Sequence, residues 1–166
     1  MTAARLCFLP IACAILCAGL NAAVATEPPA GSFPVKTYDA SVLGKDAMMW
    51  CATQDDKGVL YFGGDKLFVN DGERWRSYKM GDTYAVRSLA FGPDGRLWAA
   101  GTNELGWFER TPTDAWQYHS LRSKLPAALK ELGNVWNVYA TPQGAIFVSD
   151  RQVLIWNGSR FTWQPY

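Results

Sequence analysis

The chain has 166 residues, enough for one domain with a sizeable core, and its formal net charge is +1. Aromatic residues make up 14% of it, including eight Trp, and charged residues make up 19%. This balance excludes a disordered chain and a helix bundle, and it is typical of short strands joined by tight turns. Lys and Arg are interspersed with Asp and Glu, which argues against a nucleic-acid partner and against an anionic-membrane surface.

Residues 1–25 have the three parts of a secretory signal peptide. Arg5 supplies the positive charge, residues 6–20 form an apolar run, and Ala23-Val24-Ala25 offers small residues for a signal peptidase. The pattern predicts cleavage before Thr26, with Asn21-Ala22-Ala23 as the second candidate for the cleavage site, and a periplasmic or secreted protein. The apolar run is shorter than the roughly 20 residues that span a bilayer, so an uncleaved anchor is the less favoured alternative.

Loss of the signal peptide would leave Cys51 as the single cysteine of the mature chain, which could then form no internal disulfide. Cys51 lies in an apolar strand pattern, which predicts a small core residue. The chain has one histidine, His119, far away in the sequence, so we expect no Cys–His nucleophile.

An internal repeat follows a lead-in segment, residues 26–46. Three segments, 50–63, 87–101 and 136–149, each read as strand, turn, strand. Their turns share a glycine, and an aromatic residue stands three positions after each one; the pairs are Gly58 and Tyr61, Gly95 and Trp98, and Gly144 and Phe147. The spacing predicts that the three glycines occupy equivalent hairpin positions with positive φ.

Each repeat continues with a third and a fourth strand pattern, and four short strands every 40 or so residues are typical of a β-propeller blade. The predicted fold class is all-β, with about three four-stranded antiparallel propeller blades within residues 47–166. Their predicted bounds are about 47–80, 84–120 and 134–166.

A short helical insertion is predicted at about 124–133, between the second and third blades. Leu125, Leu129 and Leu132 fall at i, i+4 and i+7, and Gly133 suits a C-terminal cap. We expect this helix to pack on a blade face, with partner binding as the alternative.

The repeats resemble the two-component regulator propeller repeat, which reads as a Trp strand, an Asp-x-x-Gly turn, a Leu-Trp-Ile-Gly strand and a Tyr-Asp-Gly stretch. The first unit carries the resemblance in Asp55-Asp56-Lys57-Gly58, Leu60-Tyr61-Phe62-Gly63 and Asn70-Asp71-Gly72. The second unit departs from it with Arg87 at the Trp position, and the third has Ser149 in place of a glycine. The resemblance implies the periplasmic half of a membrane sensor that detects a ligand, often a saccharide.

A propeller closes with about four to eight blades, so three blades make an incomplete ring. We therefore expect this sequence to be the N-terminal part of a longer protein that supplies further blades in cis, with self-association of a short protein as the alternative. Membrane attachment would come only through a region downstream of this sequence.

The candidate ligand-binding residues are Trp50, Arg87 and Trp136, which start the innermost strands and would ring the mouth of a central channel. Trp faces stack on sugars, and Arg donates hydrogen bonds to hydroxyl or carboxylate groups. The alternative is that both Trp pack between blades. Asp55 and Asp56 are adjacent, which favours a turn over acid–base chemistry.

The sequence predicts no catalytic residue, cofactor or metal site, because glycine-rich phosphate loops, metal-ligand spacings and nucleophile motifs are absent from it. The leading hypothesis is a ligand-sensing or interaction module of a bacterial signalling protein of the two-component sensor type. The alternatives are a secreted propeller enzyme of the lactonase or lyase type and a plain protein-binding scaffold. Fold alone does not identify the ligand.

Overall fold

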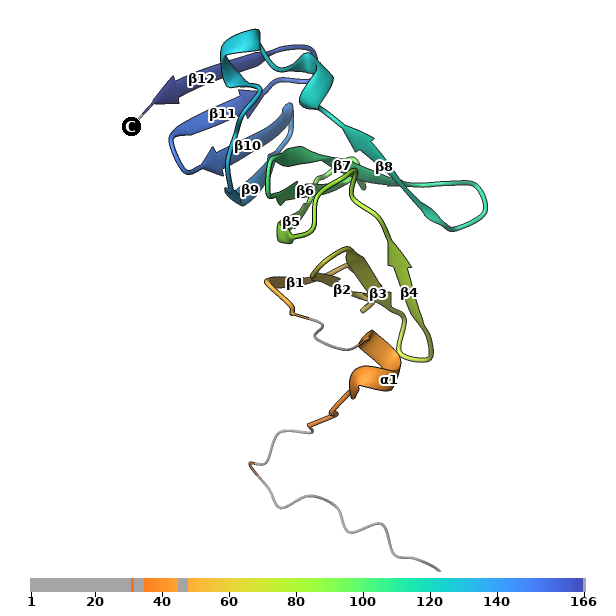
Figure 1. Cartoon of the computed structure of the whole chain (residues 1–166). Helices are drawn as coiled ribbons and strands as arrows, with labels where there is room; N and C mark the ends of the chain where they lie inside the picture. The colour runs from red at the N-terminus through yellow and green to blue at the C-terminus, as the bar shows by residue number, and fades with distance from the viewer. Residues whose placement is uncertain (1–30, 32–34, 45–47, 166) are drawn as a thin grey trace, which may run out of the picture. The chain divides into compact units, whose positions relative to one another are not determined.

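The computed structural model describes residue 31, residues 35–44 and residues 48–165 (Figure 1). The predicted signal peptide and most of the lead-in segment lie outside the described residues. The chain divides into two units, Met1–Thr37 and Tyr38–Tyr166, and everything below concerns the second. Among the described residues, no helix has the length and apolar character needed to cross a membrane.

The second unit is all-β. After the short helix α1 (Ala40–Leu43), its described part forms three four-stranded antiparallel sheets, each made of four consecutive strands (Figure 1). Sheet 1 contains β1 (Cys51–Gln54), β2 (Leu60–Gly63), β3 (Leu67–Asn70) and β4 (Trp75–Tyr78). Sheet 2 contains β5 (Val86–Phe91), β6 (Leu97–Gly101), β7 (Glu104–Arg110) and β8 (Trp116–Ser120). Sheet 3 contains β9 (Val135–Thr141), β10 (Gly144–Ser149), β11 (Gln152–Trp156) and β12 (Phe161–Pro165). The prediction of an all-β chain with three four-stranded units is confirmed.

Sheet 2 is buried on both faces, and β6 shows why. All five of its residues are buried. Successive side chains of a strand point to opposite faces, so Leu97 and Ala99 belong to the hydrophobic cluster shared with sheet 1. Trp98 and Ala100 belong to the cluster shared with sheet 3. The near-continuous apolar run of β6 thus reflects a strand packed between two neighbouring sheets.

The three sheets repeat the same pairing register. In sheet 2, Val86 pairs with Gly101 and Ser88 with Ala100, which leaves Arg87 as the extra residue of a β-bulge. In sheet 3, Val135 pairs with Ser149 and Asn137 with Val148, which leaves Trp136 as the extra residue. In sheet 1, the N–H of Trp50 donates to the carbonyl oxygen of Gly63 at 2.7 Å, just before β1. Trp50, Arg87 and Trp136 are therefore equivalent positions of the repeat.

The first hairpins of the sheets are not all alike. Gly58 and Gly95 have φ of +84° and +79° and lie in the loops 55–59 and 92–96, as predicted. Gly144 instead begins β10 and pairs with Thr141 across a tighter turn, so the predicted equivalence is wrong for this glycine. A Cβ added there would lie 2.0 Å from the carbonyl oxygen of Trp156, so a close backbone approach is what requires glycine.

Because the first hairpin of sheet 3 is shorter, the residue three positions after its glycine faces a different neighbouring sheet than in sheets 1 and 2. Tyr61 belongs to the cluster between sheets 1 and 2, and Trp98 to the cluster between sheets 2 and 3, so each faces the following sheet. Phe147 also stands three residues after a glycine, but it lies in the cluster between sheets 2 and 3 and faces the preceding sheet. The structural counterpart of Trp98 in sheet 3 is Ile146, because Ala90 pairs with Trp98 and Tyr139 with Ile146.

The connection between sheets 2 and 3 forms two 3₁₀ turns, η1 (Arg122–Lys124) and η2 (Ala127–Leu129), in place of the expected amphipathic helix. Leu125 precedes Pro126 and is extended, with φ −70° and ψ 139°, since a following proline disfavours the α conformation. The expected packing is present, because the leucines at 125, 129 and 132 are all buried in the cluster between sheets 2 and 3.

The segment before β1 covers part of sheet 1. The ring of Tyr38 packs edge-on against Trp75, with 4.9 Å between centroids. Val42 and Leu43 border the same surface beside Phe68 and Trp75. These contacts lie on β3 and β4, the outer strands of sheet 1.

Candidate functional site

The three predicted ligand-binding residues form one row. The guanidinium carbon of Arg87 lies 4.5 Å from the ring centroid of Trp50 and 4.4 Å from that of Trp136. The cation is thus held between two indole rings, each worth about 0.5–1 kcal/mol at an exposed site. Trp50 and Trp136 remain 46% and 43% exposed, so the row lies at the surface. We name these three residues the Trp–Arg–Trp row.

Contacts that the first strands of sheets 2 and 3 make with the preceding sheet bring the row together. The N–H of Val86 in β5 donates to the carbonyl oxygen of Gly64, directly after β2, at 2.7 Å. The N–H of Val138 in β9 donates to the hydroxyl of Ser88 in β5 at 3.1 Å. The repeated bulge then places one side chain from each sheet at the same level, which explains why residues so far apart in the sequence stack.

The Arg87 guanidinium retains an unused donor. Its Nε donates to the hydroxyl of Thr102 at 3.2 Å, and that hydroxyl donates to Oδ1 of Asn134 at 3.0 Å. Its Nη1 is buried and has no hydrogen-bond partner within the described part of the chain. Buried polar groups are normally paired, so this N–H is an unsatisfied donor within the row.

Asp150 gives the row a negative charge. Its carboxylate accepts the indole N–H of Trp136 at 2.5 Å and the backbone N–H of Asn134 at 2.8 Å. The hydrogen bonds from Asn134 and then from Trp136 lower the pKa of Asp150, so it is ionised at neutral pH. The exposed surface therefore combines two indoles, a guanidinium and a carboxylate.

Sequence reasoning did not identify Asp150, Thr102 or Asn134. A signal for two of them was present in the repeat. Thr102 and Asp150 both directly follow the second strand of their sheets, after the paired residues Gly101 and Ser149. Aligning the repeats by register would have placed these two polar residues beside the row.

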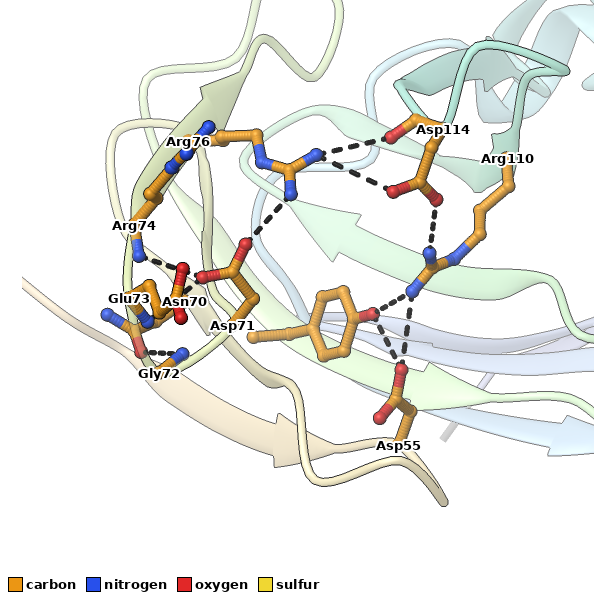
Figure 2. Close-up of polar contacts among 10 residues, drawn as sticks. Asp55, Asn70, Asp71, Gly72, Glu73, Arg74, Arg76, Arg110 and Asp114 are labelled. Carbon is orange, nitrogen blue, oxygen red and sulfur yellow. Dashed lines mark hydrogen bonds and ion pairs between the residues drawn. The ribbon is translucent and has the colours of Figure 1, made fainter.

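A second polar cluster lies at the other end of β1 and links sheets 1 and 2 (Figure 2). Arg110 lies at its centre. It donates to the hydroxyl of Tyr61 at 2.8 Å, and its ion pairs with Asp55 and Asp114 measure 3.3 Å and 2.5 Å. Arg76 continues the chain of charges from Asp114 to Asp71, with 2.8 Å to the latter.

The titrating groups of this cluster have shifted pKa values. Burial raises the pKa of Asp55, but the opposing interactions are stronger, so the net result is a lowered pKa. These interactions are the hydrogen bonds from Tyr61 and from the N–H groups of Val59 and Lys57, and the positive charge of Arg110. Burial, and then the hydrogen bond to Asp55, raise the pKa of Tyr61 to about 12. Hydrogen bonds from the Arg74 N–H and the Arg76 side chain lower the pKa of Asp71 to about 2. Each charge is satisfied by a protein partner, so the cluster links sheets 1 and 2 structurally. We name this cluster, which consists of Asp55, Tyr61, Asp71, Arg76, Arg110 and Asp114, the fastening.

A pocket of about 420 Å³ opens beside the fastening. It is lined by Asp55, Asp56, Lys57, Phe91, Pro93 and Arg110, among others. Asp55 accepts the N–H groups of Lys57 and Val59 at 3.0 and 2.9 Å, so its carboxylate holds the hairpin turn as predicted. Its oxygens are thereby committed to the turn, to Tyr61 and to Arg110.

Cys51 and His119 have the following surroundings in the described part of the chain. Burial raises the pKa of Cys51 to about 11, so its thiol is neutral at physiological pH. His119 stacks on Trp107 with 5.3 Å between centroids and lies 3.4 Å from Glu109. Over the described ranges, no group of three or more His, Cys, Asp or Glu residues is placed to hold a metal ion.

Comparison with protein-family models and with curated proteins found no match to this chain. The resemblance to the two-component regulator propeller repeat therefore stays an expectation from the repeat motifs.

Proposed function

We propose that this chain is an exported, non-catalytic binding module built of propeller blades, and that it binds a saccharide on the Trp–Arg–Trp row. It would serve as the ligand-sensing part of a bacterial signalling protein. The observation that carries the proposal is the row itself, in which two exposed indoles flank a guanidinium that has an unused N–H donor.

The chemistry of the row suits a sugar. A pyranose ring offers an apolar face to an indole and hydroxyls at its edge. Asp150 is exposed and ionised and accepts hydroxyl hydrogens, while Arg87 donates to hydroxyl or carboxylate oxygens. A row of three side chains spaced along neighbouring sheets favours an extended oligosaccharide over a single sugar.

Tryptophan fluorescence titration tests the proposal. The probes are a neutral glucose tetramer and a galacturonic acid tetramer, which differ in the carboxylates that Arg87 would bind. We expect saturable binding of at least one of them, and a loss of about ten-fold or more in affinity for Trp136→Ala, because burial of an aromatic face contributes about 1.5–3 kcal/mol.

Trp163→Ala is the matched control. Trp163 lies in β12, outside the row, and is 46% exposed, as is Trp50. Equal weakening by Trp136→Ala and Trp163→Ala, or no saturable signal with either tetramer, would contradict saccharide binding on the row.

Export is tested separately. N-terminal sequencing of the protein recovered from cells should give a chain that begins at Thr26 and lies outside the cytoplasm, because residues 23–25 carry the small side chains that signal peptidases require. An intact Met1 in a cytoplasmic fraction would overturn this part of the proposal.

A further inference from the structure

The two sheet-to-sheet interfaces of this chain are built in the same way. In both, the first strand of the following sheet packs on the first two strands of the preceding sheet: β5 on β1 and β2, and β9 on β5 and β6. We call the face of a sheet that points toward the next sheet along the chain its following-side face, and the opposite face its preceding-side face. Each interface joins the following-side face of one sheet to the preceding-side face of the next. The side chains at these positions are almost fully buried: Trp98, Ala100 and Leu105 on the following side of sheet 2, and Leu97, Ala99, Ala145 and Phe147 on the preceding sides of sheets 2 and 3.

Sheet 3 has a following-side face whose residues belong to neither of the two hydrophobic clusters between sheets. Strand pairing places Tyr139, Ile146 and Ile155 in one row of this face and Val148 and Val153 in the next. Their counterparts in sheet 2 are Ala90, Trp98, Trp107, Ala100 and Leu105. Tyr139 and Ile155 are 56% and 44% exposed. We name these five residues of sheet 3 the open following face.

Sheet 1 has the complementary feature. On its preceding side, Leu60 corresponds to Leu97 and Ala145, which are both 0% exposed, yet Leu60 itself is 38% exposed. Tyr38 and α1 cover only the outer strands on this side, around Phe68 and Trp75. The inner strands, with Ala52 and Leu60, form what we name the open preceding face.

We propose that these two open faces bind each other between two copies of this chain, head to tail, so that two chains form one closed assembly of six sheets. Six lies within the four to eight or so sheets at which propellers close. A face-to-face pairing of two open following faces would break the rule that both internal interfaces obey, whereas head-to-tail pairing continues it.

Polar groups at the two faces also match. The hydrogen bond between sheets 2 and 3 runs from the N–H of Val138 to the side chain of Ser88. By register, Asn137 is the counterpart of Ser88 and pairs with Val148 of the open following face, and Ala52 is the counterpart of Val138 on the open preceding face. Asn137 is exposed and offers a side-chain oxygen to the N–H of Ala52 in the second copy. This inference does not depend on saccharide binding.

Light scattering after size-exclusion chromatography tests the proposal with single charges on each face. Tyr139→Lys places a cation on the open following face, and Leu60→Lys places one on the open preceding face. Tyr84→Lys is the matched control, since Tyr84 is 72% exposed and lies in the β4–β5 connection, outside both faces. We expect a dimer for the unchanged chain and for Tyr84→Lys, and an increase of about ten-fold or more in the dimer dissociation constant for the other two.

Mixing separates head-to-tail pairing from other arrangements. An equal mixture of Tyr139→Lys and Leu60→Lys still contains one intact pair of faces, so dimers should reappear in it. A monomeric unchanged chain, or a Tyr139→Lys chain as dimeric as the control, would overturn the proposal. A Leu60→Lys chain that stays dimeric while the Tyr139→Lys chain is monomeric would also overturn it. That result would indicate that the dimer forms between the two open following faces. Circular dichroism checks that each variant is folded, and Ile155→Lys replaces Tyr139→Lys if that variant is not.

Discussion

At the scale of single residues, two groups of charged side chains in the described part of the chain have different roles. The fastening around Arg110 pairs every charge within hydrogen-bond reach and joins sheets 1 and 2. The Trp–Arg–Trp row instead leaves Nη1 of Arg87 without an acceptor among the described residues. The charges of the fastening stabilise the packing of sheets 1 and 2, whereas the row is the ligand site that we propose.

The fastening predicts a specific dependence of stability on pH. The folded chain holds Asp71 at a pKa of about 2 and lowers that of Asp55, so both carboxylates bind protons more weakly folded than unfolded. Their contribution to stability is therefore complete above their ordinary pKa of about 4 and is lost as the pH falls toward about 2. We expect the thermal unfolding midpoint to fall across this window, and Asp71→Asn to lower the midpoint at pH 7 and to flatten the fall.

Asp56→Asn is the control for this prediction, because Asp56 is exposed and lies outside the fastening. Unfolding midpoints that depend on pH in the same way for Asp71→Asn and for the unchanged chain would show that the Asp71 carboxylate does not contribute as proposed.

At the scale of elements, the sequence was informative where a strand pattern is local. The Trp, Gly and aromatic spacings predicted three four-stranded units, because alternation and turn residues are read within a few positions. It failed at Gly144, where a longer-range contact decides, because the carbonyl of Trp156 in β11 leaves no room for a Cβ at position 144. It also failed at residues 124–133, where the cause is local: Leu125 before Pro126 is extended, so the leucine spacing does not give one continuous helix.

The site was predictable to a similar degree. Trp50, Arg87 and Trp136 could be selected because they share one repeat position, although the bulges that align them are not visible in the sequence. Asp150 could be selected only once the strand register was known, because it follows β10 as Thr102 follows β6, and its contacts with Trp136 and Asn134 form in the fold.

The difference between the hairpins gives a prediction for two glycines. Gly58 has φ +84°, and an added Cβ would meet only the Gln54 side chain at 3.6 Å, so Gly58→Ala should cost about 1 kcal/mol of backbone strain. Gly144→Ala should cost clearly more, because the added Cβ would meet the carbonyl oxygen of Trp156 at 2.0 Å and the backbone must move. Urea unfolding of both variants measures the two costs; an equal loss at both positions would mean that the hairpins are alike after all.

At the scale of the whole molecule, the central feature is a single interface used twice. It buries both faces of sheet 2, but only one face of sheet 1 and one of sheet 3. Apolar surface left open in this way favours association, since monomeric proteins rarely expose contiguous apolar patches larger than a few hundred Å². The open following face and the open preceding face thus follow from the same repeat that makes the core.

Sedimentation equilibrium of the unchanged chain over a hundred-fold range of concentration tests this most directly. The account predicts one species at low concentration with the mass of one chain, and a species of twice that mass that dominates at high concentration and does not grow further, because a closed pair leaves no face open. A mass equal to one chain at every concentration, or one that keeps rising beyond two chains, would contradict it.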